Sequence, residues 1–487
     1  MPEEKNVLRS LNKLIEARGS IVDVLFEHAP KNALTIYTQM MPGDVVRPEF
    51  STWRDEQYAW RNTVALHDQS YHMHSLEVSG SQAFDLCQYL ATNSFAKFNI
   101  GAAKQFLACS PEGFVIGDAI IYRLAQDRFL IVGNPATTDW VEFNAAHLAF
   151  DVNTTLDPMW ALNKARRRQF YRFQVEGPNA WKLLEELNGG PVPEIKFFQS
   201  DTLTIAGCEV RGMRHTMGGV PGLELSGPWE DRVAVKKALV EHGAKHGLRQ
   251  IGSIAYFTTV VESGWWAVPV SAVYSGEGTA AYRDWLTERN AAARMSLSGS
   301  FYSADPQDYY LTPFDLNYGH LVKFDHDFIG REALEVLKEQ PHRTKVTLVW
   351  NADDVLKVQQ AQLEGADPGD TPLPITLPLA ATGRLHYDKV LNDEGDVIGL
   401  STYPAYSANE RAVMSLASID SAHAEFGTEV KFVWGEDGGG DRSKGRIEPH
   451  KQIEIRAIVA PCPISRAAQS YRSEIGVKRG SVENLQD

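Results

Sequence analysis

The sequence predicts an α+β fold with mainly antiparallel sheets, followed by a small C-terminal β-barrel or sandwich. Helix-like and strand-like segments alternate irregularly over the first 341 residues. The strand-like segments mix apolar and polar residues, whereas the strands of a doubly wound parallel sheet are nearly continuous apolar runs. From residue 342 onward the pattern becomes almost entirely strand-like. We therefore expect two units, residues 1–341 and residues 342–487.

Composition and charge restrict the class of protein and its partners. Of 487 residues, 43% are hydrophobic and 23% are charged, which is typical of a globular protein. The formal net charge of −14 argues against nucleic acid or an anionic membrane as the main partner, because both require dense positive charge. The N-terminal segment lacks the apolar core of a signal peptide, and no apolar run is long enough to span a membrane. We therefore expect a soluble, cytoplasmic protein.

The first half of the chain carries several helix and strand signals. Apolar residues recur at helical spacing in residues 1–25, and residues 49–66 form a helix-like run with two tryptophans on one face. Alternation over residues 75–135 predicts strands and turns, interrupted by a helix that starts at Ser81. Residues 172–189 predict a strand, a turn and then a helix that ends at glycine.

The second half predicts fewer helices and many strands. Residues 201–228 predict a strand pair, residues 231–248 an amphipathic helix, and residues 328–343 a helix that stops at Pro341. Beyond it, short strand-like segments with turn residues between them indicate a barrel or sandwich of about 130 residues. The glycine-rich tract at 436–445 is most simply a flexible hairpin tip, and we assign it no function.

The segment ALHDQSYHMHSLEVSG, at residues 65–80, is unusually rich in histidine. His72 and His74 form a His-X-His pair, which in a strand would place both rings on one face. Zinc or iron would need two more ligands, and no second cluster with ligand spacing stands out. A metal site, a catalytic or substrate-binding pocket and a satisfied structural network therefore all stay open. The four cysteines contain no CxxC pair and are expected to be buried, reduced thiols: Cys87, Cys109, Cys208 and Cys462.

Two later segments also carry residues capable of chemistry. Glu224 lies in a strand between two leucines, after a Gly/Pro turn. Its carboxylate either faces solvent or points at a ligand, and if it is buried it needs hydrogen-bond donors. Tyr256 on an apolar helix is by itself most simply a core residue, as are the adjacent Trp265 and Trp266, although tryptophans can also stack a flat ligand.

Six segments resemble, in order, elements of the glycine-cleavage T-protein (aminomethyltransferase) superfamily. They are LHDQSYHMHSLEVSG, EGFVIGDAII, FQVEGPNA, GGVPGLELSG, VVESGW and FDHDFIGREAL. Their order and spacing hold across residues 60–340. The resemblance implies a multi-domain, ring-shaped fold with folate in a central funnel, and the strand-rich tail fits the C-terminal domain of the superfamily.

Within this superfamily, the chain resembles most the tetrahydrofolate-dependent aromatic O-demethylases of the vanillate/3-O-methylgallate type, which have syringate demethylases as relatives. The similarity lies in the segment from Trp53 to Met73 and in the Tyr256/Trp265 pair. It implies a methyltransferase that moves a methyl group from an aryl methyl ether to tetrahydrofolate. The products would be 5-methyltetrahydrofolate and a phenol, and the substrate would be a guaiacol-, vanillate- or syringate-like compound.

Carried over position by position, the resemblance assigns roles to individual residues. The folate-binding residues would be Glu224, Gln174, Trp265 and Asp118, with the two oxygens of Glu224 on the N–H donors of the pterin. The catalytic residues would be Tyr256 and His72, and Gln69, His72 and Met73 would face the aromatic ring. A tyrosine suits this chemistry, because the departing phenolate has a conjugate-acid pKa of about 10, similar to that of the tyrosine donor. No metal is required.

Two positions depart from the patterns of relatives. Asp118 stands where aminomethyltransferases carry a pair of aspartates, but Gly117 replaces its partner, which disfavours amine chemistry. Asn134 stands where relatives hold the substrate carboxylate with an arginine, so Arg123 or Arg128 would have to serve, or the substrate lacks the carboxylate. Three other functions stay open: a demethylase for a sulfonium or amine donor, a folate-binding protein without transfer chemistry, and a metal hydrolase.

Overall fold

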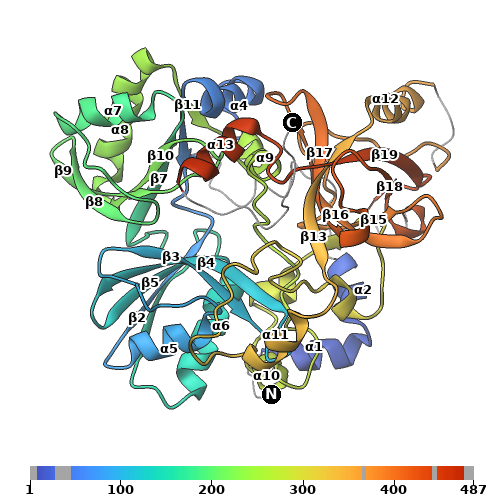
Figure 1. Cartoon of the computed structure of the whole chain (residues 1–487), viewed down its shortest axis with the longest axis horizontal. Helices are drawn as coiled ribbons and strands as arrows, with labels where there is room; N and C mark the ends of the chain where they lie inside the picture. Colours follow the sequence, from blue (N-terminus) through green and yellow to red (C-terminus); the bar gives the residue numbers. More distant parts are fainter. Residues whose placement is uncertain (1–7, 28–44, 365–368, 441–446, 476–487) are drawn as a thin grey trace, which may run out of the picture.

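The computed structural model describes residues 8–27, 45–364, 369–440 and 447–475. Within these residues, a six-stranded sheet, a five-stranded sheet and a closed six-stranded barrel form three bodies arranged in a triangle (Figure 1). All but one of the strand pairs in these bodies are antiparallel; β1 and β11 pair in parallel. The predicted α+β class, with antiparallel sheets and a C-terminal barrel, is confirmed.

The six-stranded sheet has one apolar and one polar face. Its strands are, in spatial order, β11 (Leu248–Ile251), β1 (Val64–Asp68), β7 (Phe170–Glu176), β10 (Gly222–Pro228), β9 (Cys208–Arg214) and β8 (Ser200–Ile205). The apolar face packs on two helices, α7 (Ala180–Asn188) and α8 (Arg232–Gly243). On the other face, Gln174 stands directly between His67 and Glu224 on the neighbouring strands. Because opposite residues of antiparallel strands share a face, these polar side chains all point away from the apolar core.

The five-stranded sheet packs on helices from both ends of the first unit. Its strands are β3 (Ala103–Cys109), β4 (Val115–Ala125), β5 (Arg128–Gly133), β2 (His74–Ser79) and β6 (Asn153–Asp157). Its helices are α5 (Ala83–Leu90), α6 (Pro135–His147), α10 (Ala280–Trp285) and α11 (Arg331–Leu337), together with α1 (Leu11–Arg18) and α2 (Ile21–Glu27) from the N-terminal part. One continuous core joins this sheet and all of these helices.

The barrel closes on itself and is filled by its own side chains. Its strands run in the order β13 (Arg343–Trp350), β17 (Ala412–Asp420), β16 (Val397–Ser407), β15 (Asp388–Leu391), β18 (Glu429–Trp434) and β19 (Ile453–Ala460). Trp350, Phe432 and Trp434 fill its interior. Helix α12 (Ala352–Ala361) follows β13, and the short strands β12 (Leu297–Ser298) and β14 (Leu385–His386) pair outside the barrel.

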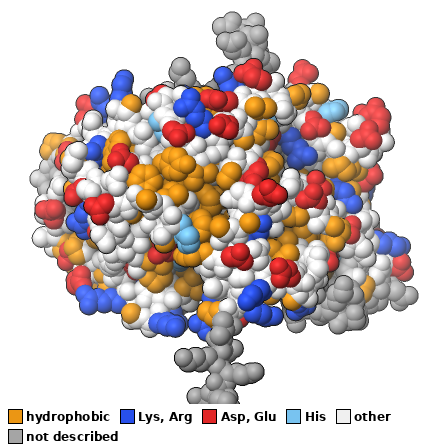
Figure 2. Space-filling view, turned by 90° about the horizontal axis from the view of Figure 1, so that it is seen from below, with side chains coloured by type: hydrophobic (Ala, Val, Ile, Leu, Met, Phe, Trp, Pro, Cys, Tyr) orange, Lys and Arg blue, Asp and Glu red, His pale blue; other side chains and the backbone are white. Residues whose placement is uncertain are grey.

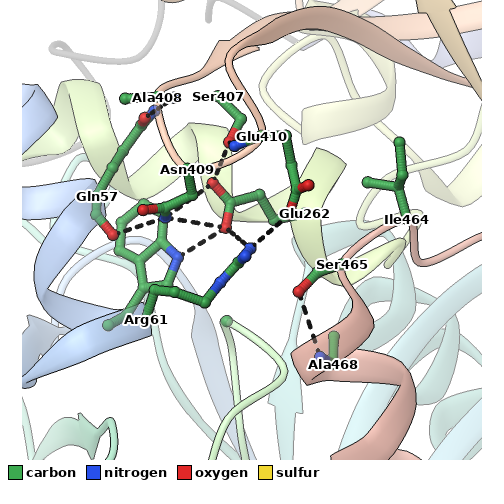
Figure 3. A network of polar contacts seen from close by, with 12 residues as sticks. Gln57, Arg61, Glu262, Ser407, Ala408, Asn409, Glu410, Ile464, Ser465 and Ala468 are labelled. Atoms are coloured by element: carbon green, nitrogen blue, oxygen red, sulfur yellow. Dashed lines mark hydrogen bonds and ion pairs between the residues drawn. The ribbon is translucent and has the colours of Figure 1, made fainter.

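Two helices connect the barrel to the rest of the molecule. In α9 (Ser253–Ser263), the fully buried carboxylate of Glu262 accepts hydrogen bonds from Trp60 Nε1 at 2.9 Å and Arg61 Nη2 at 2.8 Å, both on α4 (Trp53–Asn62). It also accepts one from Ser407 Oγ of the barrel at 2.5 Å (Figure 3). These contacts fix the position of α9 from two sides.

The last helix, α13 (Arg466–Glu474), leaves the barrel and packs on the six-stranded body. A Cβ at Gly219 would lie only 2.4 Å from Cβ of Ala468, so this approach of the helix requires glycine. The barrel begins with β13 at Arg343, close to the predicted boundary between the two units at residue 342. Because α13 packs back on the first unit, this division of the chain stays a prediction.

Several expected elements differ in detail. Residues 201–228 hold three strands instead of two, because Ala206 and Gly207 take positive φ and separate β8 from β9. The N-terminal helix is divided at Gly19, whose φ of 77° ends α1. Helix α11 ends at Leu337 and not at Pro341, and α12 and α13 were not expected. In the glycine-rich tract, Asp437–Gly439 form a 3-10 turn, and its remainder from residue 441 lies outside the described residues.

Figure 2 shows the molecule from below the view of Figure 1. Hydrophobic side chains gather over the middle of this face, and basic and acidic groups lie interspersed around them. Among the helices that the structure describes, none combines the length and the apolar character needed to cross a membrane.

Candidate functional site

A cavity of about 2150 Å³ lies where the two sheets, α9, β13 and α13 meet, and we call it the central cavity. Eight of the ten sequence-predicted site residues line it: Gln69, His72, Met73, Asp118, Asn134, Glu224, Tyr256 and Trp265. Arg123 and Gln174 do not. Residues that lie up to 196 positions apart in the sequence thus share one space.

Tyr256 and His72 form a hydrogen-bonded pair in this cavity. The hydroxyl oxygen of Tyr256, on α9, lies 3.0 Å from Nε2 of His72, and the rings meet edge to face. Burial raises the pKa of Tyr256, an effect that the nearby Arg172 partly offsets. Burial, together with the positive charges of Arg172 and Arg168, lowers the pKa of His72 to about 3. At neutral pH the pair therefore consists of a protonated phenol and a neutral imidazole.

Glu224 on β10 is buried and held by two donors. Arg172 of β7 donates from Nε to Oε1 at 3.1 Å and from Nη2 to Oε2 at 2.6 Å, and the hydroxyl of Tyr122 donates to Oε1 at 2.5 Å. Burial would raise the pKa of Glu224, but the charges of Arg172 and His215, together with the hydrogen bonds from Arg172 and Tyr122, outweigh it, and the pKa lies below its usual value. The oxygens are therefore not free for the two-pronged pterin contact expected from the sequence, because Arg172 already occupies that geometry.

The sequence analysis did not identify Arg172 or Tyr122 as site residues. The available signal is the alternation in β7, which puts Arg172, Gln174 and Glu176 on one face of a strand. All three side chains are buried. Three buried polar side chains on the same face of one strand indicate a functional site more strongly than a single one does. The remaining terminal nitrogen of Arg172, Nη1, points at the sulfur of Met73 at 3.7 Å, which is a weak acceptor.

Asp118 on β4 and Trp265, just after α9, meet on the cavity wall. Oδ2 of Asp118 accepts from Gln105 Nε2 at 2.7 Å and from Trp265 Nε1 at 3.2 Å. Burial raises the pKa of Asp118 to about 6. The glycine before it, Gly117, has no room for a side chain, since a Cβ there would lie 2.1 Å from Oγ1 of Thr137. A second carboxylate next to Asp118 is therefore sterically excluded.

Gln69 lines the same cavity with a primary amide that has no partner. Neither its Nε2 nor its Oε1 forms a hydrogen bond with the described residues, although both atoms are buried. A buried amide without partners costs free energy. A polar ligand in the central cavity would satisfy it.

The other predicted site residues lie elsewhere or are already engaged. Arg123 faces away from the cavity: it donates to the carbonyl oxygen of Phe98 at 2.5 Å and lies over the ring of Phe84. Asn134 does line the cavity, but its Oδ1 caps α6 by accepting from the backbone N–H of Ala136. Gln174 does not line the cavity, and it donates to the carbonyl oxygen of His215 at 2.9 Å. Arg128, the alternative cation, pairs with Glu77 at the surface.

The histidines near residue 70 do not form a common cluster. Strand β2 begins only at His74, so His72 precedes the strand and the two rings do not share its face. His74 contacts Oγ1 of Thr138 at 3.0 Å, and His67 lies 3.0 Å from the carboxylate of Glu176. Within the described ranges, no three His, Cys, Asp or Glu side chains come together as metal ligands would. Of the cysteines, Cys87 and Cys109 are buried, whereas Cys208 and Cys462 are partly exposed, and all four are free thiols.

Comparisons with known proteins agree with this architecture. The family model described as GCVT N-terminal domain matches residues 26–270. The chain is 43% identical over 462 residues to the syringate O-demethylase of Sphingobium sp. (strain NBRC 103272 / SYK-6), an alignment that covers 95% of this chain and 97% of that protein. It is 30% identical over 405 residues to the sesamin methylene transferase of Sinomonas sp. (strain No.22), covering 79% and 86% of the two chains.

A solved structure shares the fold. The glycine cleavage system aminomethyltransferase T of Bartonella henselae superposes with a TM-score of 0.56 at 19% identity, covering 85% of this chain and 90% of that one. The family model and the two relatives indicate the same family, and the solved structure shows the same fold. The chain belongs to the GCVT family, that of the glycine-cleavage T-proteins.

Proposed function

We propose that this protein is a tetrahydrofolate-dependent O-demethylase, which transfers the methyl group of a methoxylated aromatic compound to tetrahydrofolate and releases a phenol. Two observations support the proposal. The chain is 43% identical, over nearly its whole length, to a protein named syringate O-demethylase. In addition, the Tyr256–His72 pair lines one cavity together with Glu224 and Trp265.

The central cavity suits two ligands at once. Its volume of about 2150 Å³ exceeds the roughly 300–1,000 Å³ of an ordinary small-molecule pocket. An ionised carboxylate offers about four lone-pair positions, of which Arg172 and Tyr122 occupy three at Glu224. We infer that a pterin N–H donor takes the remaining position on Oε2, so that the pterin shares Glu224 with Arg172. Trp265 and Asp118 would continue the folate site along the wall.

Tyr256 would act on the ether oxygen of the aromatic substrate. The bond from this oxygen to the methyl carbon breaks with its electron pair on the oxygen, and the phenol of Tyr256 supplies a hydrogen bond or a proton there. Tetrahydrofolate, when bound, would supply the nitrogen that accepts the methyl group, and the proton released from that nitrogen would balance the proton given to the departing oxygen. His72, neutral at pH 7, orients the phenol of Tyr256. The contacts of Glu262 hold α9 in place, and a fixed Tyr256 would help to align the substrate with the methyl acceptor, which lowers the barrier.

The alternative donors fit this site less well. Transfer from a sulfonium or an ammonium donor leaves a neutral sulfide or amine, which does not need a phenolic proton donor at the leaving atom. The aspartate pair of the aminomethyltransferases is also excluded, because Gly117 cannot carry a side chain beside Thr137. A folate-binding protein without transfer chemistry would leave the Tyr256–His72 pair without a role.

One experiment separates these functions. The purified protein, treated with a chelator, is incubated with tetrahydrofolate and a panel of syringate, vanillate, guaiacol, a sulfonium donor and an amine donor. We expect 5-methyltetrahydrofolate together with an equimolar phenol from at least one aryl methyl ether. Product only from the sulfonium or amine donor, or activity that requires added zinc, would overturn the proposal. Tight folate binding with no transfer from any donor would favour the non-catalytic reading.

A further inference from the structure

The segment between β1 and β2 carries several of the residues that the proposed function uses. Residues 69–73 join the two strands, and Gln69, His72 and Met73 among them line the central cavity. The segment also crosses between the bodies of the molecule, because β1 belongs to the six-stranded sheet and β2 to the five-stranded sheet. Its conformation therefore decides where the imidazole of His72 lies relative to Tyr256.

The imidazole of His72 has few contacts of its own to fix it. Its Nε2 lies 3.0 Å from the hydroxyl oxygen of Tyr256, but its Nδ1 is buried and has no hydrogen-bond partner in the described part of the chain. One hydrogen bond does not fix a ring that can turn about its side-chain torsions. The position of the ring must therefore come from the backbone of residues 69–73.

Arg168 contacts the chain on both sides of His72. Its Nη1 donates to the carbonyl oxygen of Ser70 at 2.9 Å, and its Nη2 donates to Oγ of Ser75 at 3.4 Å. Arg168 is only 4% exposed and lies in the loop between β6 and β7. Because a guanidinium is planar and rigid, its two contacts hold the backbone before and after the histidine in one arrangement.

The guanidinium is fixed in turn by Asp157, the last residue of β6. Arg168 donates from Nε to Oδ1 of Asp157 at 3.0 Å, and Oδ2 of Asp157 accepts from the backbone N–H of Gln169 at 3.0 Å. Asp157 stands opposite Ser75 in the β2–β6 pair, so both anchors belong to the same sheet. The pair is buried, and a buried, hydrogen-bonded ion pair resists displacement of either partner.

Arg168 also affects the charge of the histidine. Burial lowers the pKa of His72, and the positive charges of Arg172 and Arg168 lower it further. A neutral imidazole can accept a hydrogen bond from a phenol, whereas an imidazolium can only donate. The charge of Arg168 therefore favours the neutral form of His72, which is the form that the proposed function uses.

We infer that Arg168 is a positioning residue for the proposed demethylation, because it keeps the imidazole of His72 on the hydroxyl of Tyr256. The inference rests on the proposed function, in which His72 orients the phenol. Arg168 itself does not line the central cavity, so it acts through the segment that it holds. A lysine would supply the charge, but one ammonium cannot reproduce the fork that reaches Ser70, Ser75 and Asp157 together.

A double-mutant cycle tests whether Arg168 acts through His72. Demethylation of syringate, or of the ether that the wild type uses best, is measured for the wild type, Arg168→Gln, His72→Gln and the combined variant. We expect Arg168→Gln to lower kcat by about 10²-fold, the usual cost of a small displacement at the site, with less than about a threefold change in the Kd for tetrahydrofolate. In the His72→Gln background the same substitution should cost less than about threefold, because the group that it positions is already absent. Losses that multiply would overturn the inference.

The titration of His72 gives a readout that does not depend on activity. In NMR spectra the ring should titrate at a higher pH in Arg168→Gln than in the wild type, because a nearby positive charge is lost. Arg168→Lys keeps the charge, and it should keep the titration of the wild type but recover only part of kcat. Arg167→Gln removes the same charge from the exposed neighbouring position and should change neither quantity. An unchanged titration of His72 in Arg168→Gln would overturn the inference.

A second variant keeps the test valid if the first one does not fold. Loss of Arg168 alone leaves Asp157 buried without its partner, which destabilises the folded state. Arg168→Gln/Asp157→Asn removes both charges and keeps an oxygen for the backbone N–H of Gln169, so it should fold and show the same loss in kcat. Wild-type kcat in this variant would overturn the inference and leave the proposed function standing. No demethylation of any ether by the wild type would overturn both.

Discussion

The hydroxyl of Tyr256 and Nε2 of His72 lie 3.0 Å apart although 184 residues separate them in the chain. Helix α9 carries the tyrosine, and the network around Glu262 holds this helix against both α4 and the barrel (Figure 3). His72 stands in the bend just before β2. The contact therefore depends on the packing of three bodies, and it joins a phenol and an imidazole that both stay uncharged at neutral pH.

Replacing Tyr256 by phenylalanine tests its role as a donor. The variant keeps the ring and its packing on His67 and His72 but loses the hydrogen bond to the ether oxygen. We expect kcat for demethylation to fall by about 10²- to 10⁴-fold, the usual contribution of a positioned acid, while the Kd for tetrahydrofolate changes less than threefold. Tyr58→Phe, at an exposed position, is the matched control. Equal losses in kcat and in folate affinity would show that Tyr256 is structural.

The protonation of His72 predicts the shape of the pH–rate profile. With a pKa of about 3, His72 stays neutral where an ordinary histidine would titrate, near pH 6.5. The profile of kcat should therefore show no inflection from this residue between pH 5 and 8, and NMR should find its ring titrating below pH 4. A histidine whose folded pKa is lowered contributes stability that is fully present above pH 6.5 and is lost as the pH falls toward 3. His72→Gln should flatten that part of the stability curve. A His72 titration near pH 6.5 would contradict the prediction.

The site could be predicted from the sequence through the resemblance to the aminomethyltransferase superfamily, since Glu224 and Tyr256 taken singly did not reveal a role. Glu224 in its strand and Tyr256 on its helix were expected, and both line the cavity. Arg172 was not expected, because its contact with Glu224 depends on strand register. Arg172 stands opposite Ser226, two positions along β10 from Glu224. Periodicity reveals which residues share a face, but not which residues of two neighbouring strands meet.

The same limit applies to the fold: patterns along one segment could be predicted, but contacts between distant segments could not. Alternating strands with turn residues between them indicated the barrel, since each strand places its apolar side chains in the interior. The return of α13 to the first body was not expected, because it depends on the close approach of Gly219 and Ala468. The expectation that Arg123 holds the substrate carboxylate has a related weakness. Arg123 bonds a backbone carbonyl outside the cavity, and only the tertiary structure reveals this.

The pairing of Arg172 with Glu224 predicts how folate binding depends on pH. In the wild type, the lowered pKa of Glu224 keeps it ionised above pH 5, so affinity should be flat there. In Arg172→Gln the burial of Glu224 is uncompensated and its pKa rises, so folate affinity should fall as the pH drops through the raised value. Glu224→Gln should weaken binding at least tenfold at every pH. Both dependences are measured by tryptophan fluorescence, and a flat profile for Arg172→Gln would show that Arg172 does not control the charge of Glu224.

Asp118 predicts a variant that is more stable than the wild type at neutral pH. Burial raises the pKa of Asp118 to about 6, above its usual value of 3.8, so the folded chain favours the protonated form. A carboxyl group with a raised folded pKa costs stability at pH values above 6, and this cost disappears as the pH falls from 6 to below 3.8. Asp118→Asn keeps an oxygen to accept from Gln105 and Trp265 but carries no charge. We expect its free energy of unfolding in urea to exceed that of the wild type by about 3 kcal/mol at pH 7.5 and by much less at pH 4. Asp85→Asn, at an exposed position, should show no such difference. A gain of the same size at both pH values would mean that packing, and not the buried charge, is responsible.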